Sequence, residues 1–193
     1  MMLRSFIAIE TPVEIQNAIA QTAAPLKNLL PKSLVRWVPP QNAHLTLKFL
    51  GDISPANLER LAEVLKAEAA SHDVFSISIG GLGAFPNQRR ARVIWMGLEA
   101  PPALAALQHG VEAAAAKLGY PLEERPFSPH LTIGRVAQTA SVSDLQLIRS
   151  ALESTKVGIL GTIRVQAIHI FKSLLQPAGP VYTLLYTLSM KST

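Results

Sequence analysis

Two short segments repeat the same arrangement of a histidine and a threonine. The first reads His-Leu-Thr-Leu at positions 44–47, and the second reads His-Leu-Thr-Ile at positions 130–133. Because side chains alternate between the faces of a strand, His44 and Thr46 would lie on one face, about 6.6 Å apart along the strand. The second segment would present its own imidazole and hydroxyl in the same way.

Two imidazoles and two hydroxyls suit a displacement at a phosphodiester. That reaction needs a base on the attacking oxygen and an acid on the leaving oxygen, and histidine serves in either role because its ordinary pKa is about 6.5. The hydroxyls of Thr46 and Thr132 can donate hydrogen bonds to phosphoryl oxygens as negative charge develops. The sequence therefore predicts His44 and His130 as an acid–base pair that requires no metal. Spacing alone does not say which of them is the base.

A single His-x-Thr segment is an ordinary half-exposed strand pattern, so the prediction depends on the repetition. The remaining histidines favour simpler interpretations: His72 in a loop, His109 on an exposed helix face and His169 packed in a strand. A histidine metal site is disfavoured, since no two histidines have the i, i+4 spacing and no carboxylates cluster with them. The chain has no cysteine, which excludes thiolate zinc sites and cysteine nucleophiles.

The hydrophobic pattern predicts the strands and helices that must position these residues. Apolar or alternating runs indicate strands at 6–10, 43–50, 74–79, 92–98, 130–136, 163–171 and 181–188. Helical spacing indicates helices that begin near Thr11, Ser54, Pro101 and Ser141. We expect Thr11 to cap the first helix, with Glu14 completing a capping box.

The order of these elements repeats along the chain at a nearly constant offset. The matching pairs are His44 with His130, Ser54 with Ser141, and the strand starts Val74 with Ile163. This spacing predicts an internal duplication within one α+β domain over residues 1–193. Two pseudo-symmetric βαβαββ lobes, approximately 1–90 and 91–193, would place antiparallel sheets around a central cleft with the helices outside. Such symmetry would bring both motifs together.

Strict alternation also assigns the neighbours of the two motifs. It places Lys48 on the open face with the first histidine, and Phe49 on the core face. Arg135 falls on the core face, away from His130, unless a bulge at Gly134 turns it round. The core face of the two strands would hold four further apolar side chains: Leu45, Leu47, Leu131 and Ile133.

The charge balance suits an anionic partner. Lys plus Arg number 18 against 13 acidic residues, and the formal net charge is +5. The basic run Arg89, Arg90 and Arg92 would either guide an RNA backbone or simply be solvated. Three aromatic residues are candidates to stack on RNA bases, with packing as the alternative: Trp37, Phe85 and Phe127.

The chain also favours a soluble setting. No apolar run approaches the roughly 18 residues that a membrane span needs. The first apolar segment is interrupted early by Glu10, unlike a signal peptide. We therefore expect a cytoplasmic protein with no membrane contact, and a monomer.

The chain resembles the two-histidine (2H) phosphoesterase superfamily, and within it the RNA 2′,3′-cyclic phosphodiesterases, also called 2′-5′ RNA ligases. The resemblance covers nearly the whole length and includes both His-x-Thr-x motifs in this order. The matching pieces are RSFIAI at 4–9, RWV at 36–38, HLTLKFLG at 44–51, GLGAFP at 81–86, RPFSPHLTIGR at 125–135, and Ser173 followed by Tyr182.

The resemblance implies RNA with a 2′,3′-cyclic phosphate end as substrate, tRNA fragments among the examples, and no cofactor. His130 would be the proton acceptor that acts on water, and His44 the proton donor to the leaving 3′-oxygen, which yields a 2′-phosphomonoester. Thr46 and Thr132 would hold the phosphate, and Arg135 resembles a further phosphate contact. An RNA 5′-hydroxyl in place of water would give 2′-5′ ligation without ATP.

Two other functions stay open at this point. One is a module that binds phosphorylated RNA ends without chemistry, although such a module would need cations more than two titrating histidines. The other is a related 2H enzyme that acts on a different 2′-5′ or cyclic nucleotide substrate. Since specificity in these enzymes would lie in loops, the motifs discriminate poorly between these substrates.

Overall fold

Nine strands and four helices, with two short 3-10 turns, form the chain in the computed structural model, which describes residues 2–177 and 179–191. The strands are β1 (Leu3–Glu10), β2 (Val35–Trp37), β3 (His44–Ile53), β4 (Phe75–Phe85), β5 (Val93–Glu99), β6 (Leu131–Val136), β7 (Ile159–Val165), β8 (Ala167–Gln176) and β9 (Gly179–Ser189). The helices are α1 (Val13–Leu29), α2 (Pro55–Ala70), α3 (Pro102–Ala116) and α4 (Val142–Ser154), and the turns are η1 (Pro40–Asn42) and η2 (Gln88–Arg90).

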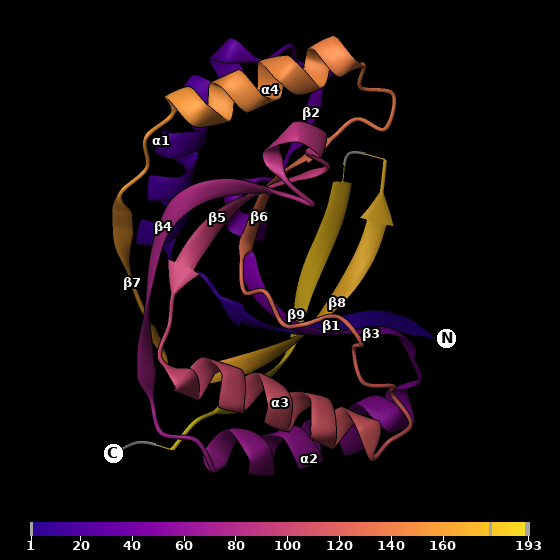
Figure 1. The fold of residues 1–193 in the computed structure, drawn as a ribbon. Helices are drawn as coiled ribbons and strands as arrows, with labels where there is room; N and C mark the ends of the chain where they lie inside the picture. Colours follow the sequence, from indigo (N-terminus) through magenta and orange to yellow (C-terminus); the bar gives the residue numbers. More distant parts are fainter. Residues whose placement is uncertain (1, 178, 192–193) are drawn as a thin grey trace.

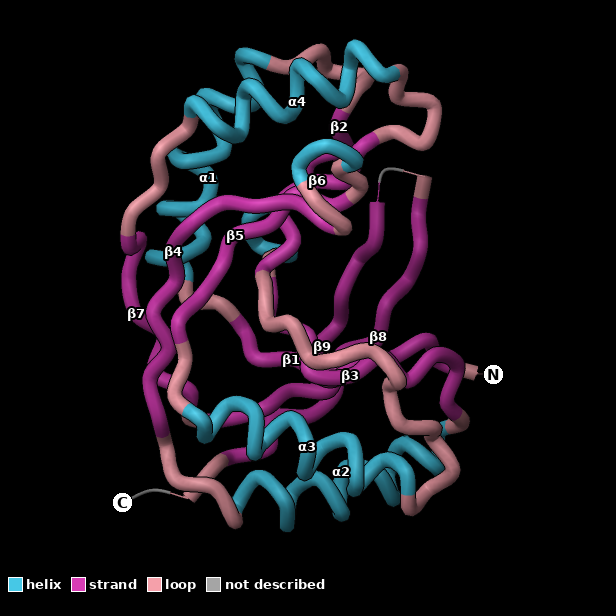
Figure 2. The backbone as a smooth tube through the Cα atoms, viewed as in Figure 1, coloured by secondary structure: helices cyan, strands magenta, loops and turns pink. Residues whose placement is uncertain are grey.

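All nine strands belong to one curled sheet. Its order is β7-β4-β5-β6-β3-β1-β8-β9, with β2 added to β6, and every paired strand is antiparallel. The helices lie outside the sheet in two groups, α1 with α4 at one end and α2 with α3 at the other (Figures 1 and 2). The predicted α+β class, with antiparallel strands inside and helices outside, is confirmed.

The sheet exchanges strands between the two halves of the sequence. β4 comes from the first half but lies beside β5, while β8 comes from the second half and lies beside β1. The helices are exchanged too, because α2 packs on α3 and on β8 and β9. The spatial halves of the molecule therefore differ from the sequence segments 1–90 and 91–193, since β4 of the first segment and β8 and β9 of the second complete the other half of the sheet.

Local sequence explains where α2 and α4 begin. Ser54 caps α2 by accepting a hydrogen bond from the Asn57 backbone, and Pro55 occupies the first turn. Ser141 caps α4 in a reciprocal capping box with Asp144. None of the helices in the described ranges is long and apolar enough to cross a membrane.

Two predictions of local structure are wrong. Thr11 does not cap α1: it is buried, and its hydroxyl donates to the backbone oxygen of Ala43, so it ties the start of α1 to the start of β3. The predicted strand at 163–171 is two strands, because the chain leaves β7 at Gln166 and enters β8 near the opposite edge of the sheet. Both segments are apolar and adjacent, so the pattern alone does not separate them.

A bulge in β3 breaks the alternation that places Phe49 in the core. Ala8 pairs with Thr46 but Ile7 pairs with Lys48, so one extra residue is inserted between these pairs. Lys48 is consequently buried, with 5% of its surface exposed, whereas Phe49 is 69% exposed. The predicted faces of Lys48 and Phe49 are therefore reversed, while Leu45, Leu47, Leu131 and Ile133 are buried as expected.

Candidate active site

The two His-x-Thr motifs meet at the seam between the halves of the sheet. A single residue pair, Leu45 with Leu131, joins β3 to β6, and the strands are antiparallel there. On the face opposite these two leucines, this register sets His44 against Thr132 and Thr46 against His130. Directly opposed side chains lie about 5 Å apart at Cβ and diagonal ones about 7–8 Å apart. The two histidines therefore occupy one diagonal, with the threonines on the other.

Both imidazoles are held in the same way. The Nδ1 atom of His44 lies 2.7 Å from the backbone oxygen of Asn42, and that of His130 lies 2.8 Å from the backbone oxygen of Ser128. Since a carbonyl oxygen only accepts, Nδ1 must carry the proton in both rings. Nε2 of each ring is then left to take up or release a proton.

His44 lies in a box of aromatic rings. Phe6 stacks on its imidazole with centroids 4.6 Å apart, and Tyr182 packs edge-on at 5.2 Å. Phe171 stacks on Phe6 in turn, at 5.4 Å. Burial among these rings lowers the pKa of His44, and the positive charges of Arg135 and His130 lower it further, against the opposing effect of the bond to Asn42.

His130 is more open to solvent than His44. It immediately precedes β6, and its ring packs edge-to-face with Phe85, with centroids 4.8 Å apart at an angle of 83°. Phe85 in turn contacts Trp95 at 5.2 Å, and Trp95 is the strand partner of Thr132. Phe85, a candidate to stack on RNA, thus lies against the second histidine.

Arg135 reaches the histidine face through a bulge in β6. Gly134 pairs with Ile94 but Thr132 pairs with Trp95, so Ile133 is the extra residue, and Arg135 emerges exposed. Strict alternation, which places Arg135 on the core face, therefore fails here, and the pairing supports the alternative expectation of a bulge beside Gly134. Gly134 permits the close packing here, because a Cβ at this position would lie 2.8 Å from the Val35 side chain.

Three arginines lie near enough to Tyr182 for their charges to act on its phenol. The charges of Arg135, Arg36 and Arg4 all act to lower the pKa of Tyr182, although burial of the phenol dominates and raises it. Arg4, Arg36, Phe6 and Tyr182 come from three different strands, and sequence reasoning assigns none of them a role. Their only sequence signal is that each lies in a segment of family resemblance.

The remaining candidates make contacts within the protein. Trp37 pairs with Gly134 on β2 and lies under the Lys27 ammonium, and Phe127 packs against the core. His72 contacts Glu68 at 2.7 Å, and His169 contacts the hydroxyl of Thr187 at 3.2 Å. Within residues 2–177 and 179–191, no three His, Asp or Glu side chains are grouped as metal ligands.

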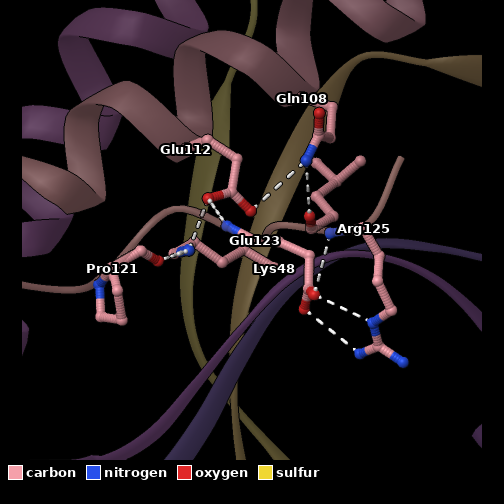
Figure 3. A network of polar contacts seen from close by, with 7 residues as sticks. Lys48, Gln108, Glu112, Pro121, Glu123 and Arg125 are labelled. Atoms are coloured by element: carbon pink, nitrogen blue, oxygen red, sulfur yellow. Dashed lines mark hydrogen bonds and ion pairs between the residues drawn. The ribbon is translucent and has the colours of Figure 1, made fainter. Parts of the chain in front are cut away.

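Lys48 lies on the other side of β3, in a buried polar network (Figure 3). Its ammonium donates to Glu112 of α3 at 2.6 Å and to the backbone oxygen of Pro121 at 2.8 Å. The same Glu112 carboxylate accepts the backbone N–H of Glu123 at 3.2 Å. The network therefore fastens the segment that leads from α3 to His130 onto the strand that begins with His44.

Comparison with known proteins gives relatives over nearly the whole chain. The family model described as LigT like Phosphoesterase matches residues 9–95 and 98–182. An RNA 2′,3′-cyclic phosphodiesterase of Methanothermobacter thermautotrophicus is 34% identical over 183 residues, covering 95% of this chain and 96% of the relative. A protein of the same name from Archaeoglobus fulgidus is 34% identical over 182 residues, covering 93% and 96%.

Solved structures agree with these relatives. A Thermus thermophilus protein, TT0787, superposes with a TM-score of 0.80 at 27% identity, covering 98% of each chain. E. coli LigT complexed with 3′-AMP superposes with a TM-score of 0.76 at 25% identity, covering 98% of this chain and 99% of that one. The match of family model, sequence and fold, on a sheet whose seam carries both His-x-Thr motifs, places this chain in the LigT-like family of 2H phosphoesterases.

Proposed function

We propose that this protein hydrolyses RNA 2′,3′-cyclic phosphodiester ends to 2′-phosphomonoesters by metal-free acid–base catalysis. One observation carries the proposal: the two imidazoles lie diagonally across the β3–β6 seam. In each ring Nδ1 is hydrogen-bonded to a backbone carbonyl, which leaves Nε2 for proton transfer. A phosphate between them would have one ring nitrogen for the attacking oxygen and one for the leaving oxygen. The relatives named as RNA 2′,3′-cyclic phosphodiesterases support the substrate.

The reaction assigns one proton transfer to each histidine. His130 takes a proton from water at Nε2, and the water oxygen forms a bond to phosphorus. The bond from phosphorus to O3′ breaks, and His44 donates the proton on its Nε2 to that oxygen. The product has a 2′-phosphate and a 3′-hydroxyl, and both histidines return to their starting states by exchange with solvent.

The remaining polar groups act on the phosphate. The hydroxyls of Thr46 and Thr132, on the other diagonal, donate hydrogen bonds to non-bridging oxygens, and the guanidinium of Arg135 adds positive charge beside them. The bound phosphate is itself an anion, so it offsets the charge of Arg135 and helps His44 to hold the proton that it must donate.

The same groups permit ligation. An RNA 5′-hydroxyl that replaces water as the attacking group would lose its proton to His130, and O3′ would again leave with a proton from His44. The product is a 2′-5′ linkage, and no ATP is consumed because the cyclic phosphate supplies the reactive bond.

The test is turnover of a panel of cyclic-phosphate, linear 2′-5′ and linear 3′-5′ substrates, run with and without EDTA. We expect 2′-phosphate products from cyclic ends, unaffected by chelator, and a loss of at least about a thousandfold in kcat for His44→Ala and for His130→Ala. Full turnover by either folded variant would contradict the proposal. Tight RNA binding without product would indicate a binding module, and preference for a linear substrate a different 2H activity.

A further inference from the structure

A basic pocket lies outside the seam, between η2 and α4. Its volume is about 600 Å³, and its lining residues are Asn87, Gln88, Arg89, Arg90, Arg149 and Glu153. The short turn η2 packs against α4 at the end of the molecule that also carries α1 (Figure 1). Three of the six lining side chains are guanidinium groups, so the pocket is a site of concentrated positive charge.

The charges in this pocket are only partly neutralised. Arg149 is paired with Glu153 at 2.7 Å, on the same helix. Within the described ranges, neither Arg89 nor Arg90 forms an ion pair with a carboxylate. Both are exposed, and the Asn87 side chain accepts their backbone N–H groups, which fixes the turn that carries them. Two guanidinium groups are therefore left to bind an external anion.

Guanidinium groups select among anions by geometry. Their planar donors match the oxygens of a phosphate, and two or three of them together favour a phosphodiester backbone over an isolated chloride-like ion. The pocket is open to solvent and its lining side chains are all polar or charged, so it suits a backbone that passes through it rather than an enclosed small molecule.

The pocket is also close to the second histidine. Phe85, whose ring packs against His130, is the last residue of β4, and Asn87 at the pocket is two residues further on. Two residues span at most about 7 Å. Phe85 pairs with Val93, and Val93 pairs with Arg135 on its other side, so Arg135 lies at this same end of the sheet. Positive charge therefore continues from the seam toward the pocket.

We propose that the pocket of Arg89, Arg90 and Arg149 is a second phosphate-binding subsite, which holds the RNA backbone upstream of the cyclic end. The inference rests on the proposed function and extends it: the preferred substrate is an oligonucleotide rather than a cyclic mononucleotide. The mononucleotide has no upstream phosphate, so it serves as an internal reference for the chemistry at the seam.

The experiment compares kcat/KM for a 2′,3′-cyclic mononucleotide with kcat/KM for an oligoribonucleotide of about ten residues with the same end, a length typical of single-strand grooves. In Arg89→Gln/Arg90→Gln the ratio of oligonucleotide to mononucleotide should fall roughly tenfold or more, through KM. The dependence of log(1/KM) on log salt should flatten by about 0.7 for each phosphate that the variant no longer binds. The matched control is Arg60→Gln/Lys66→Gln, which removes the same charge from the exposed face of α2 at the opposite end of the molecule.

A second variant tests the opposite direction. Glu153→Gln removes the carboxylate that pairs with Arg149, and it should raise the oligonucleotide preference above that of the unaltered protein. An unchanged ratio in both pocket variants, or an equal fall in the α2 control, would overturn the subsite. If the unaltered protein does not hydrolyse even the mononucleotide, the proposed function itself fails, so the two failures are distinguishable.

Discussion

His44 must hold a proton in surroundings that oppose its charge. Burial among aromatic rings and the nearby charge of Arg135 both lower its pKa below the ordinary value. We therefore predict that Arg135→Gln raises the pKa of His44, because it removes one of the two charges that disfavour the imidazolium. An NMR titration of the His44 ring measures this shift directly, and the unaltered protein should titrate at the lower pH.

The same variant tests whether the titration of His44 controls the rate. The pH profile of kcat/KM has limbs at the pKa values of the two titrating groups, and Arg135→Gln should move the limb that belongs to His44 to higher pH by the shift that NMR measures, even as the rate itself drops. A profile that keeps both limbs in place would show that titration of His44 does not limit the rate. Arg36→Gln is the matched control, since Arg36 acts on Tyr182 and not on His44.

The sequence predicted which face of a strand a side chain lies on only for residues very near each histidine. Alternation over three residues correctly put each histidine on one face with its threonine. It failed for Lys48 and Phe49 and for Arg135, because a residue is inserted at the last position of each motif, Leu47 in β3 and Ile133 in β6. Gly134 is a local sign of the bulge in β6, whereas no residue beside Leu47 marks the bulge in β3, because a bulge depends on the partner strand as well.

At the scale of elements, the Lys48–Glu112 pair connects the two motifs. Both side chains are buried, so loss of one partner leaves an uncompensated charge. We predict that Lys48→Met lowers the free energy of unfolding by about 3–5 kcal/mol, measured by urea denaturation. We expect the loss of local stability to be largest in the segment after α3, because Lys48 and Glu112 bind its backbone at Pro121 and Glu123.

The double variant Lys48→Met/Glu112→Leu is the control for this prediction. It removes both charges, so it should regain much of the stability that either single change loses. If the loss of stability in the double variant equals the sum of the losses in the two single variants, the ion pair does not couple β3 to the segment before His130. Since that segment positions the imidazole, turnover should follow the same order as stability.

Helix starts were predictable where the capping side chain acts locally, at Ser54 and Ser141. Thr11 fits the same pattern, but its hydroxyl donates to Ala43, which lies 32 residues away in the sequence. The two strands within 159–176 were fused in the prediction, because their separation is set by pairing with β4 and β1 in opposite halves of the sheet. Long-range contacts therefore decided the two failed predictions, the role of Thr11 and the boundary between β7 and β8.

At the scale of the whole molecule, the repeat in the sequence predicted a shared site, and the two motifs do meet at one seam. The exchange of strands was not predictable from the repeat, because the hydrophobic pattern of β4 is the same whichever half of the sheet it joins. The exchange has a consequence for folding: each half of the sequence lacks strands that cover its own apolar residues.

We therefore predict that residues 1–90 and 91–193 do not fold as separate chains. The first fragment would expose β4 without β5 and β7, and β1 without β8, leaving buried residues such as Ile7 and Ile77 in water. Each fragment alone should show no cooperative thermal transition by circular dichroism. Mixed after joint refolding, the fragments should regain the transition and the hydrolysis of a cyclic nucleotide, because β4–β5 and β1–β8 pairing and the β3–β6 seam all form between them. A cooperative transition in either fragment alone would show that the halves are independent lobes, and that the histidines meet by docking of two folded units rather than by a single interlocked sheet.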